Sequence, residues 1–202
     1  MLYIICRFIW FVLFKIFVGL KGYGRDNIPK SGGFILASNH ASNMDPVAIG
    51  VASARPINFM AKEELFSNKF FGFILGRVNV FPVKRGKADL SSIKEAIKRL
   101  KRGEGLLLFP QGTRRDTIEL EDAKGGVGFF ASKAGVPIVP TLIKGSDVSL
   151  PKGSKLPKRT GVNICFGQPI YTKPNQDYNQ IAQSVISAIK QLEQAQNKSK
   201  TK

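Results

Sequence analysis

Residues 34–46 read FILASNHASNMDP, and this stretch decides the fold that the sequence predicts. Its first four residues are apolar and predict a strand over 34–37, whereas the polar residues after them predict a loop. Pro46 is typical of the first turn of a helix, and a helix is predicted over 46–53. A strand, a loop and a helix in this order form the repeating unit of an α/β protein.

The same alternation continues through the rest of the chain. Further strands are predicted at residues 57–60, 78–83, 105–109, 138–143 and 162–166, and further helices at residues 67–75, 89–101, 126–134 and 178–194. The pattern predicts one α/β domain with a largely parallel or mixed sheet that is flanked by helices. Residues 150–161 (LPKGSKLPKRTG) are predicted to form a basic loop.

Length and charge narrow the class of protein. The chain has 202 residues and 43% hydrophobic content, enough for one ordinary domain with its own core. It carries 31 basic and 14 acidic side chains, and this net charge of +17 predicts an anionic partner such as nucleic acid, a phosphorylated small molecule or a membrane of acidic lipids. Two cysteines and one histidine cannot build a disulfide framework or a zinc cluster, so we expect a reducing compartment and no metal.

The first twenty residues, MLYIICRFIWFVLFKIFVGL, are apolar apart from Arg7 and Lys15. A cleaved secretory signal does not fit, because the apolar run starts before the first positive charge and no small-x-small site follows. A full membrane span would bring both cations into the bilayer at about 2.5–3.5 kcal/mol each. We therefore favour a helix half-sunk in one leaflet over a single spanning helix, and either form would keep the protein at the cytoplasmic face of the cell membrane.

In such a helix Arg7 and Lys15 would lie about 80° apart and face lipid phosphates. The aromatic side chains would then sink among the acyl chains: Phe8, Trp10, Phe11, Phe14 and Phe17. The alternative is an N-terminal helix packed in the domain core. The expected organisation is an anchoring helix over residues 1–21, a folded domain over 22–193 and a disordered polar tail over 194–202.

His40 is the only histidine, and it follows the predicted strand 34–37. In an open α/β sheet, ligands bind at the carboxyl ends of strands. Asp45 lies five residues further on and could turn back to accept one imidazole N–H, which leaves the other ring nitrogen to take a proton from a substrate hydroxyl. The pair predicts a catalytic dyad. The structural alternative is that Asp45 caps the helix that Pro46 begins, and that His40 is only a polar loop residue.

Three further strand ends carry cations. Residues 109–115 (FPQGTRR) follow one predicted strand, and their glycine, arginines and free N–H groups suit a phosphate. Residues 81–87 (FPVKRGK) end another strand, and Lys62 follows a third. Each turn alone is typical of a solvated edge, but the parallel strands would bring Lys62, Arg85 and Arg114 to one mouth with the dyad.

At these residues the sequence resembles the glycerolipid acyltransferases, and among them the 1-acylglycerol-3-phosphate O-acyltransferases. The resemblance spans about residues 33–169 and rests on four blocks in order: Asn39-His40 with Asp45, residues 80–85, Phe109-Pro110-x-Gly112-Thr113-Arg114, and residues 136–140 (VPIVP). It implies a glycerolipid acyltransferase-like fold. It also implies transfer of a fatty acyl group from a thioester, on acyl carrier protein or coenzyme A, to the free hydroxyl of lysophosphatidate, which yields phosphatidate.

The resemblance also implies a role for each motif residue. His40 would be the general base and Asp45 its orienting partner. Lys62, Arg85 and Arg114 would hold the phosphate, with Gly112 and Thr113 shaping their loop. The implied partners are an acidic membrane surface, lysophosphatidate and the thioester carrier, with no nucleic acid and no cofactor besides the thioester co-substrate.

Gln111 departs from the family, which usually has glutamate at this position. Glutamine keeps a polar contact to the glycerol but brings no charge, so the identity of the acceptor stays open. An acyltransferase that uses glycerol-3-phosphate or another lysolipid is therefore an alternative.

Two other functions compete with acyl transfer. A nucleic-acid-binding protein would fit the charge, but the aromatic side chains gather in the first twenty residues and not among the cations. Residues 126–131 (GVGFFA) match a dinucleotide fingerprint with Asp147 as a ribose ligand, yet residues 119–124 (ELEDAK) before them do not predict a strand.

Overall fold

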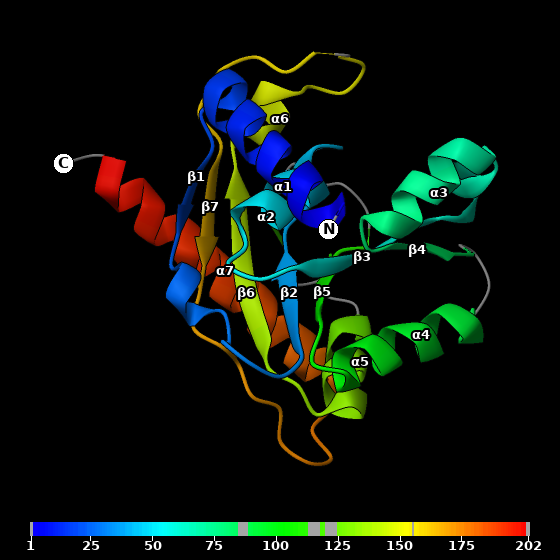
Figure 1. Ribbon diagram of the computed structural model, residues 1–202. Coiled ribbons are helices and arrows are strands. Elements are labelled where there is room, and N and C mark those ends of the chain that lie inside the picture. Colours follow the sequence, from blue (N-terminus) through cyan, green and yellow to red (C-terminus); the bar gives the residue numbers. More distant parts are fainter. Residues whose placement is uncertain (1, 85–88, 113–117, 120–124, 155, 201–202) are drawn as a thin grey trace.

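A seven-stranded mixed sheet forms the centre of the computed structural model, which describes residues 2–84, 89–112, 118–119, 125–154 and 156–200 (Figure 1). Its strand order is β1-β7-β6-β2-β5-β3-β4. Strands β6, β2, β5, β3 and β4 run parallel, β7 is antiparallel to β6, and β1 is parallel to β7. The strand bounds are β1 (Lys21–Tyr23), β2 (Phe34–Ser38), β3 (Ile57–Lys62), β4 (Val80–Val83), β5 (Gly105–Leu108), β6 (Ile138–Lys144) and β7 (Asn163–Phe166).

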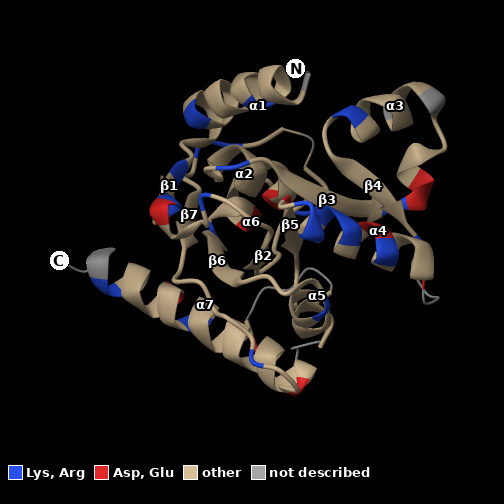
Figure 2. Cartoon of the chain, turned by 60° about the horizontal axis from the view of Figure 1, so that its bottom comes forward, with Lys and Arg blue, Asp and Glu red and all other residues tan. Residues whose placement is uncertain are grey.

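Helices cover both faces of the sheet, which confirms the predicted α/β class. The helix bounds are α1 (Leu2–Leu13), η1 (Phe14–Val18), η2 (Arg25–Asn27), α2 (Asp45–Ala52), η3 (Glu63–Phe66), α3 (Lys69–Arg77), α4 (Leu90–Lys101), α5 (Gly126–Ala134), α6 (Ser146–Ser149) and α7 (Tyr178–Lys200). In Figure 2, α1, α2 and α3 lie on one side of the sheet, and α5 and α7 lie on the other. Each side has its own cluster of buried apolar side chains, because the β2 residues alternate between them: Phe34 and Leu36 face one, Ile35 and Ala37 the other.

The C-terminal segment corrects one prediction. A disordered tail was expected from Gln194, but α7 continues to Lys200. The helix lies against the sheet, where Gln196 Nε2 donates to Cys165 Sγ at 3.1 Å and Lys144 Nζ donates to Asn197 Oδ1. Glutamine, alanine and lysine are good helix formers, so a polar composition that cannot build a core can still extend a helix that is already nucleated.

The N-terminal helix packs against the domain along one stripe. Phe14, Val18 and Leu20 belong to the core beneath it, and the Tyr3 hydroxyl accepts the Ile57 N–H, with burial raising the Tyr3 pKa. The Arg7 guanidinium donates to the Ser53 carbonyl just beyond the end of α2. Arg7 therefore binds a helix C-terminus, where a cation is favoured, and does not face lipid phosphates as predicted. The alternative prediction, an N-terminal helix packed against the domain core, is therefore correct for the inner side of this helix.

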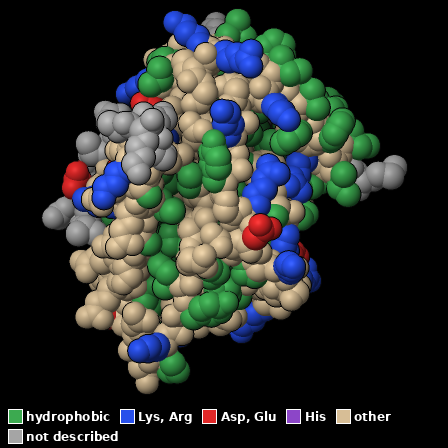
Figure 3. All heavy atoms as spheres, turned by 90° about the vertical axis from the view of Figure 1, so that its left-hand side faces the viewer, with side chains coloured by type: hydrophobic (Ala, Val, Ile, Leu, Met, Phe, Trp, Pro, Cys, Tyr) green, Lys and Arg blue, Asp and Glu red, His purple; other side chains and the backbone are tan. Residues whose placement is uncertain are grey.

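The outer stripe of the same helix is apolar and uncovered. The exposed residues are Ile4, Ile5, Phe8, Ile9, Trp10, Val12, Leu13, Ile16 and Phe17. In Figure 3 these hydrophobic side chains gather along the upper right of the molecule, with lysine and arginine side chains beside them. Within the described residues, no helix combines the length and hydropathy that a membrane span requires.

Gly105 makes room for the Phe34 ring in the central strands. It pairs with Phe34 of β2 on one side and with Ile57 of β3 on the other. A Cβ at this position would lie 2.4 Å from Phe34 Cζ and 2.9 Å from Ile57 Cγ2, so the Phe34 ring fills the space that a side chain would need.

We expect Gly105→Ala to lower the free energy of unfolding by about 1–3 kcal/mol, because the fully buried Phe34 ring cannot move away without leaving its rotamer. The matched control is Gly126→Ala at the start of α5, where an added Cβ meets nothing within 4 Å and a helix former should be neutral or slightly stabilising. Urea unfolding of both variants makes the comparison. Equal free energies of unfolding for the two variants would contradict the prediction and show that the sheet accommodates a methyl group at Gly105.

Candidate active site

The predicted contact between His40 and Asp45 is present at the carboxyl end of β2. The two atoms His40 Nδ1 and Asp45 Oδ2 are 2.8 Å apart. The imidazole is 17% exposed, whereas the carboxylate is fully buried. With Nδ1 directed at the carboxylate, Nε2 is the ring nitrogen that remains for a ligand.

The Asp45 carboxylate folds back over the loop that precedes it. Its Oδ2 atom also accepts the backbone N–H groups of Ala41 and Ser42, each at 2.8 Å. The N-cap alternative is therefore wrong: Met44 occupies the cap position of α2, and no side chain caps the helix. Three donors on one oxygen, at the start of a helix, compensate the charge of a buried carboxylate and fix its orientation. Its other oxygen, Oδ1, is buried and has no hydrogen-bond partner among the described residues.

Asn39 anchors the loop on its other side. Its side-chain amide donates to the Ile143 carbonyl and accepts the Ile143 N–H, both at 2.8 Å. The side chain thus continues the parallel pairing of β2 with β6 by one more residue, although the β2 backbone has already turned away. Ser42 Oγ adds a third tie by donating to the Leu150 carbonyl at 3.0 Å.

Phe109 supports the imidazole from the end of β5. The two rings are stacked, with centroids 4.0 Å apart and an angle of 17° between their planes. Phe109 also packs on the core cluster beneath α1 and α2, so the position of the His40 ring is fixed relative to the core. A flat aromatic contact of this kind limits the tilt of the imidazole ring.

Of the three cations of the predicted mouth, the structure describes only Lys62. Strands β2, β5, β3 and β4 are parallel, so the residues that follow them lie along one edge of the sheet. Lys62 ends β3 and is exposed, and Lys84 follows β4 and is also exposed. The predicted residues Arg85, Thr113 and Arg114 lie outside the described part of the chain.

The turn after β5 is tight. Gly112 has a φ of 71°, in the left-handed region that favours glycine, and its N–H donates to the Phe109 carbonyl at 2.9 Å. Gln111 is only 3% exposed, so its side chain is packed inside the protein. The contact of Gln111 with the acceptor glycerol stays a prediction.

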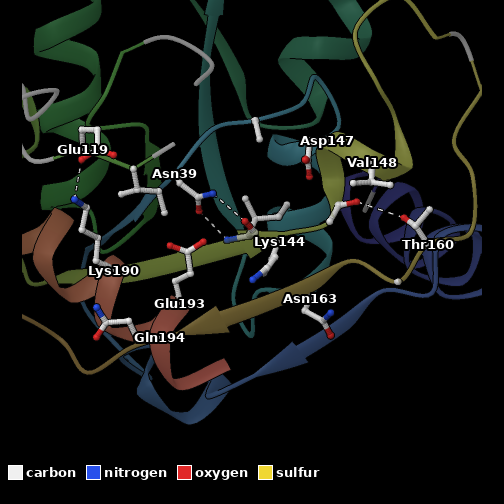
Figure 4. A pocket seen from close by; sticks show the side chains of 15 residues that line it. Asn39, Glu119, Lys144, Asp147, Val148, Thr160, Asn163, Lys190, Glu193 and Gln194 are labelled. Carbon is white, nitrogen blue, oxygen red and sulfur yellow. Dashed lines mark hydrogen bonds and ion pairs between the residues drawn. The ribbon is translucent and has the colours of Figure 1, made fainter. Parts of the chain in front are cut away.

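A cavity of about 590 Å³ lies behind the His40 loop, between the end of β6 and α7 (Figure 4). Asn39, Lys144 and Glu193 contribute to its wall, and Lys190 and Glu119 form an ion pair across one side at 3.0 Å. Asp147 also faces it. Of residues 119–124, which precede the dinucleotide-like motif, only Glu119 is described, and it is not part of a strand. Among the described residues, no group of three or more histidine, cysteine, aspartate or glutamate side chains is placed to hold a metal.

The part of the chain that contains the dyad matches a known protein family. A family model described as Acyltransferase matches residues 19–144, which include the whole dyad loop and strands β1 to β6. With this match to the region that contains the sheet and the histidine–aspartate pair, the chain is classed as an acyltransferase.

Similar proteins specify the family further. The chain is 36% identical to the 1-acyl-sn-glycerol-3-phosphate acyltransferase of Bacillus subtilis, over 76% of this chain and 74% of that protein. It is 36% identical to the enzyme of the same name from Streptococcus pneumoniae, over 73% of this chain and 54% of that one. The crystal structure of the 1-acyl-sn-glycerophosphate (LPA) acyltransferase PlsC from Thermotoga maritima superposes with a TM-score of 0.74, at 26% identity over 95% of this chain and 78% of that chain. The chain belongs to the 1-acyl-sn-glycerol-3-phosphate acyltransferase family.

The dyad generates the first prediction for activity. Changing His40 to alanine should lower acyl transfer by about 10²- to 10⁴-fold, the usual loss for a general base. It should also lower the free energy of unfolding, because the imidazole stacks on Phe109 and pairs with the buried Asp45 carboxylate. Asp45→Asn should also lower the rate, because the amide lacks the charge that three N–H donors now share.

The matched control is Asp177→Asn, where an exposed carboxylate accepts two backbone N–H groups at the start of α7, far from the dyad. Turnover and thermal unfolding of the three variants are measured together. Near wild-type turnover in His40→Ala would remove His40 from the mechanism.

Proposed function

We propose that this protein transfers a fatty acyl group from a thioester to the free hydroxyl of 1-acyl-sn-glycerol-3-phosphate. The observation that carries the proposal is the 2.8 Å contact between His40 and the buried Asp45 in a chain of this family. The hydroxyl belongs to the substrate, so the site needs a base and an anion-binding mouth but no nucleophile of its own.

In the proposed reaction, His40 Nε2 takes the proton of the acceptor hydroxyl as its oxygen attacks the thioester carbonyl. The carbon–oxygen bond forms, the carbon–sulfur bond breaks, and the leaving thiolate receives the proton from the imidazolium. Asp45 holds the Nδ1–H tautomer and balances the transient charge, as the aspartate of a catalytic triad does. The Phe109 ring restricts the imidazole to one plane during both transfers.

The acceptor phosphate is proposed to bind the cationic edge formed by Lys62 and, from the sequence, by Arg85 and Arg114. Gly112 and Thr113 are proposed to shape the loop that carries Arg114. The thioester carrier, acyl carrier protein or coenzyme A, brings the acyl group to the same edge. An acyl-transfer assay with both thioesters and a panel of lysolipids, with products identified by mass, tests the donor and the acceptor. Formation of no phosphatidate from any donor would refute the proposal.

The N-terminal helix is proposed to hold the protein on the cytoplasmic face of the membrane. Its outer apolar stripe faces away from the core, and the basic loop of residues 151–160 lies next to its C-terminal end, where the Gly161 N–H donates to the Val18 carbonyl (Figure 1). Lys152, Lys158 and Arg159 are all exposed in or beside this loop. An apolar stripe next to clustered cations is the pattern of a helix that lies in an anionic interface.

Lys62→Ala should raise the apparent KM for the phosphorylated acceptor by about tenfold and change the KM for the thioester less, because one phosphate contact is lost on the acceptor side. Lys101→Ala, an exposed lysine at the end of α4, is the matched control and should change neither value. Steady-state kinetics with each substrate varied in turn supply the measurement. An equal rise of both KM values would mean that Lys62 shapes the site without binding the phosphate.

Phe8→Ser combined with Ile16→Ser should release the protein from anionic vesicles, because both side chains are more than half exposed on the outer stripe of the helix. Removing the first twenty residues is a poorer test, since Phe14, Val18 and Leu20 belong to the core. Tyr171→Ser, an exposed aromatic in the loop between β7 and α7, is the control. Vesicle flotation at low and high salt distinguishes apolar from electrostatic binding; unchanged flotation of the double variant at both salts would contradict the proposed anchor.

A further inference from the structure

A second apolar surface lies on the segment between β3 and β4. Leu65 of η3 is 49% exposed, and Phe70 and Phe73 of α3 are 75% and 58% exposed. The spacing of Phe70, Phe73 and Arg77 places them on one stripe of the helix. Large phenylalanine side chains with this exposure are not explained by folding, because α3 packs on the sheet edge with its other face.

The charges around this surface favour an anionic partner. Residues 62–84 contain Lys62, Lys69, Arg77 and Lys84 against two acids, Glu63 and Glu64, a net charge of 4 − 2 = +2. Glu63 already lies 3.8 Å from the Lys84 ammonium. The Arg77 guanidinium lies 4.6 Å from the centre of the Phe73 ring. An arginine above an exposed ring places its charge at the margin of an apolar stripe, which is the arrangement that suits a water–lipid interface.

The helix that carries most of this surface lies on the same side of the sheet as α1. Figure 2 shows α1 and α3 on one side of the sheet, with α5 and α7 opposite. The helix α1 packs on α2, which begins at Asp45 of the dyad, whereas α3 lies beyond β5 and β3 at the β4 edge. The carboxyl edge that carries His40 and Lys62 therefore extends between the two apolar surfaces.

We propose that Leu65, Phe70 and Phe73 form a second membrane-contact surface, which inserts into the anionic interface together with α1. This proposal rests on the proposed function, because it assumes that the acceptor is taken from a lipid layer. The axis of α1 and a second contact beside it define a plane, and that plane brings the carboxyl edge of the sheet against the membrane. One contact alone would leave the domain free to rotate about α1.

A lipid surface fits these observations better than a protein partner does. The exposed stripe consists of a few side chains on one short helix, which is much less area than a stable protein interface of about 800 Å² per partner requires. The neighbouring apolar surface on α1 has the same character, aromatic and aliphatic side chains with cations at the margin, so one continuous occupant explains both.

The single tryptophan of the chain permits a direct test. Phe73→Trp in a Trp10→Phe background places the only indole on α3, and Tyr171→Trp in the same background places it in the exposed orange loop at the opposite end of the molecule in Figure 1. Both proteins are mixed with phosphatidylglycerol vesicles that carry brominated acyl chains. The indole at position 73 should shift its emission to shorter wavelength and be quenched, and the indole at position 171 should change little. Equal quenching at both positions would overturn the proposal.

A functional arm separates this surface from the catalytic assignment. Phe70→Ser combined with Phe73→Ser should weaken vesicle partitioning by about tenfold or more and lower turnover on vesicles, while turnover of detergent-dispersed lysophosphatidate stays near that of Tyr171→Ser. Insertion of the indole at position 73 in the Phe73→Trp variant, together with no acyl transfer by the wild-type protein, would refute the proposed function and leave the membrane contact standing. A shift of that indole with an added acyl carrier protein, and none with vesicles, would assign the surface to a protein and overturn the lipid proposal.

Discussion

The buried Asp45 carboxylate is the group on which the arrangement of the site depends. An ionised carboxylate without water is costly to bury unless donors surround it, and here one oxygen receives three N–H groups from the loop in front of it. Two of these donors are backbone groups of Ala41 and Ser42, so the charge shapes the loop as well as orienting His40. The loop in turn is fixed to β6 by Asn39 and to the segment after α6 by Ser42. Catalytic geometry and loop conformation are therefore a single hydrogen-bonded unit.

Much of the fold could be predicted because the central strands are short apolar runs, and all six predicted strands are present with bounds shifted by at most two residues. Strand β1 was missed because Lys21, Gly22 and Tyr23 carry no apolar pattern; its pairing with β7 depends on residues more than 140 positions away. The helical end of α7 was missed for a similar reason, since its contacts with Lys144 and Cys165 come from the sheet. Local composition indicates only which side chains a segment can bury. It does not reveal contacts with residues far away in the sequence, and these contacts hold β1 and the end of α7 in place.

For the site, the sequence predicted the His40–Asp45 contact from spacing alone, but not how the aspartate is held. Asn39 and Phe109 are part of the sequence motifs, but the sequence did not predict what they do. Their partners, Ile143 and His40, lie 104 and 69 positions away in the chain, and no local pattern indicates these contacts. Arg7 shows the opposite error: a cation in an apolar helix suggested lipid phosphates, whereas the nearest available negative end is the C-terminus of α2. Helix periodicity predicts which residues share one face of a helix, but only the folded structure shows which groups that face contacts.

The way α1 is attached has a consequence for how the enzyme samples its substrate. The helix is tied to the domain through Tyr3 and Arg7 near its start and through Phe14 and Val18 beyond its end, so it cannot pivot as a loosely tethered anchor would. If the proposed membrane association holds, this rigid attachment fixes the distance between His40 and the helix that lies in the lipid layer. An enzyme held in this way would reach only those acceptor hydroxyl groups that lie at this distance from the helix, whatever headgroup they carry.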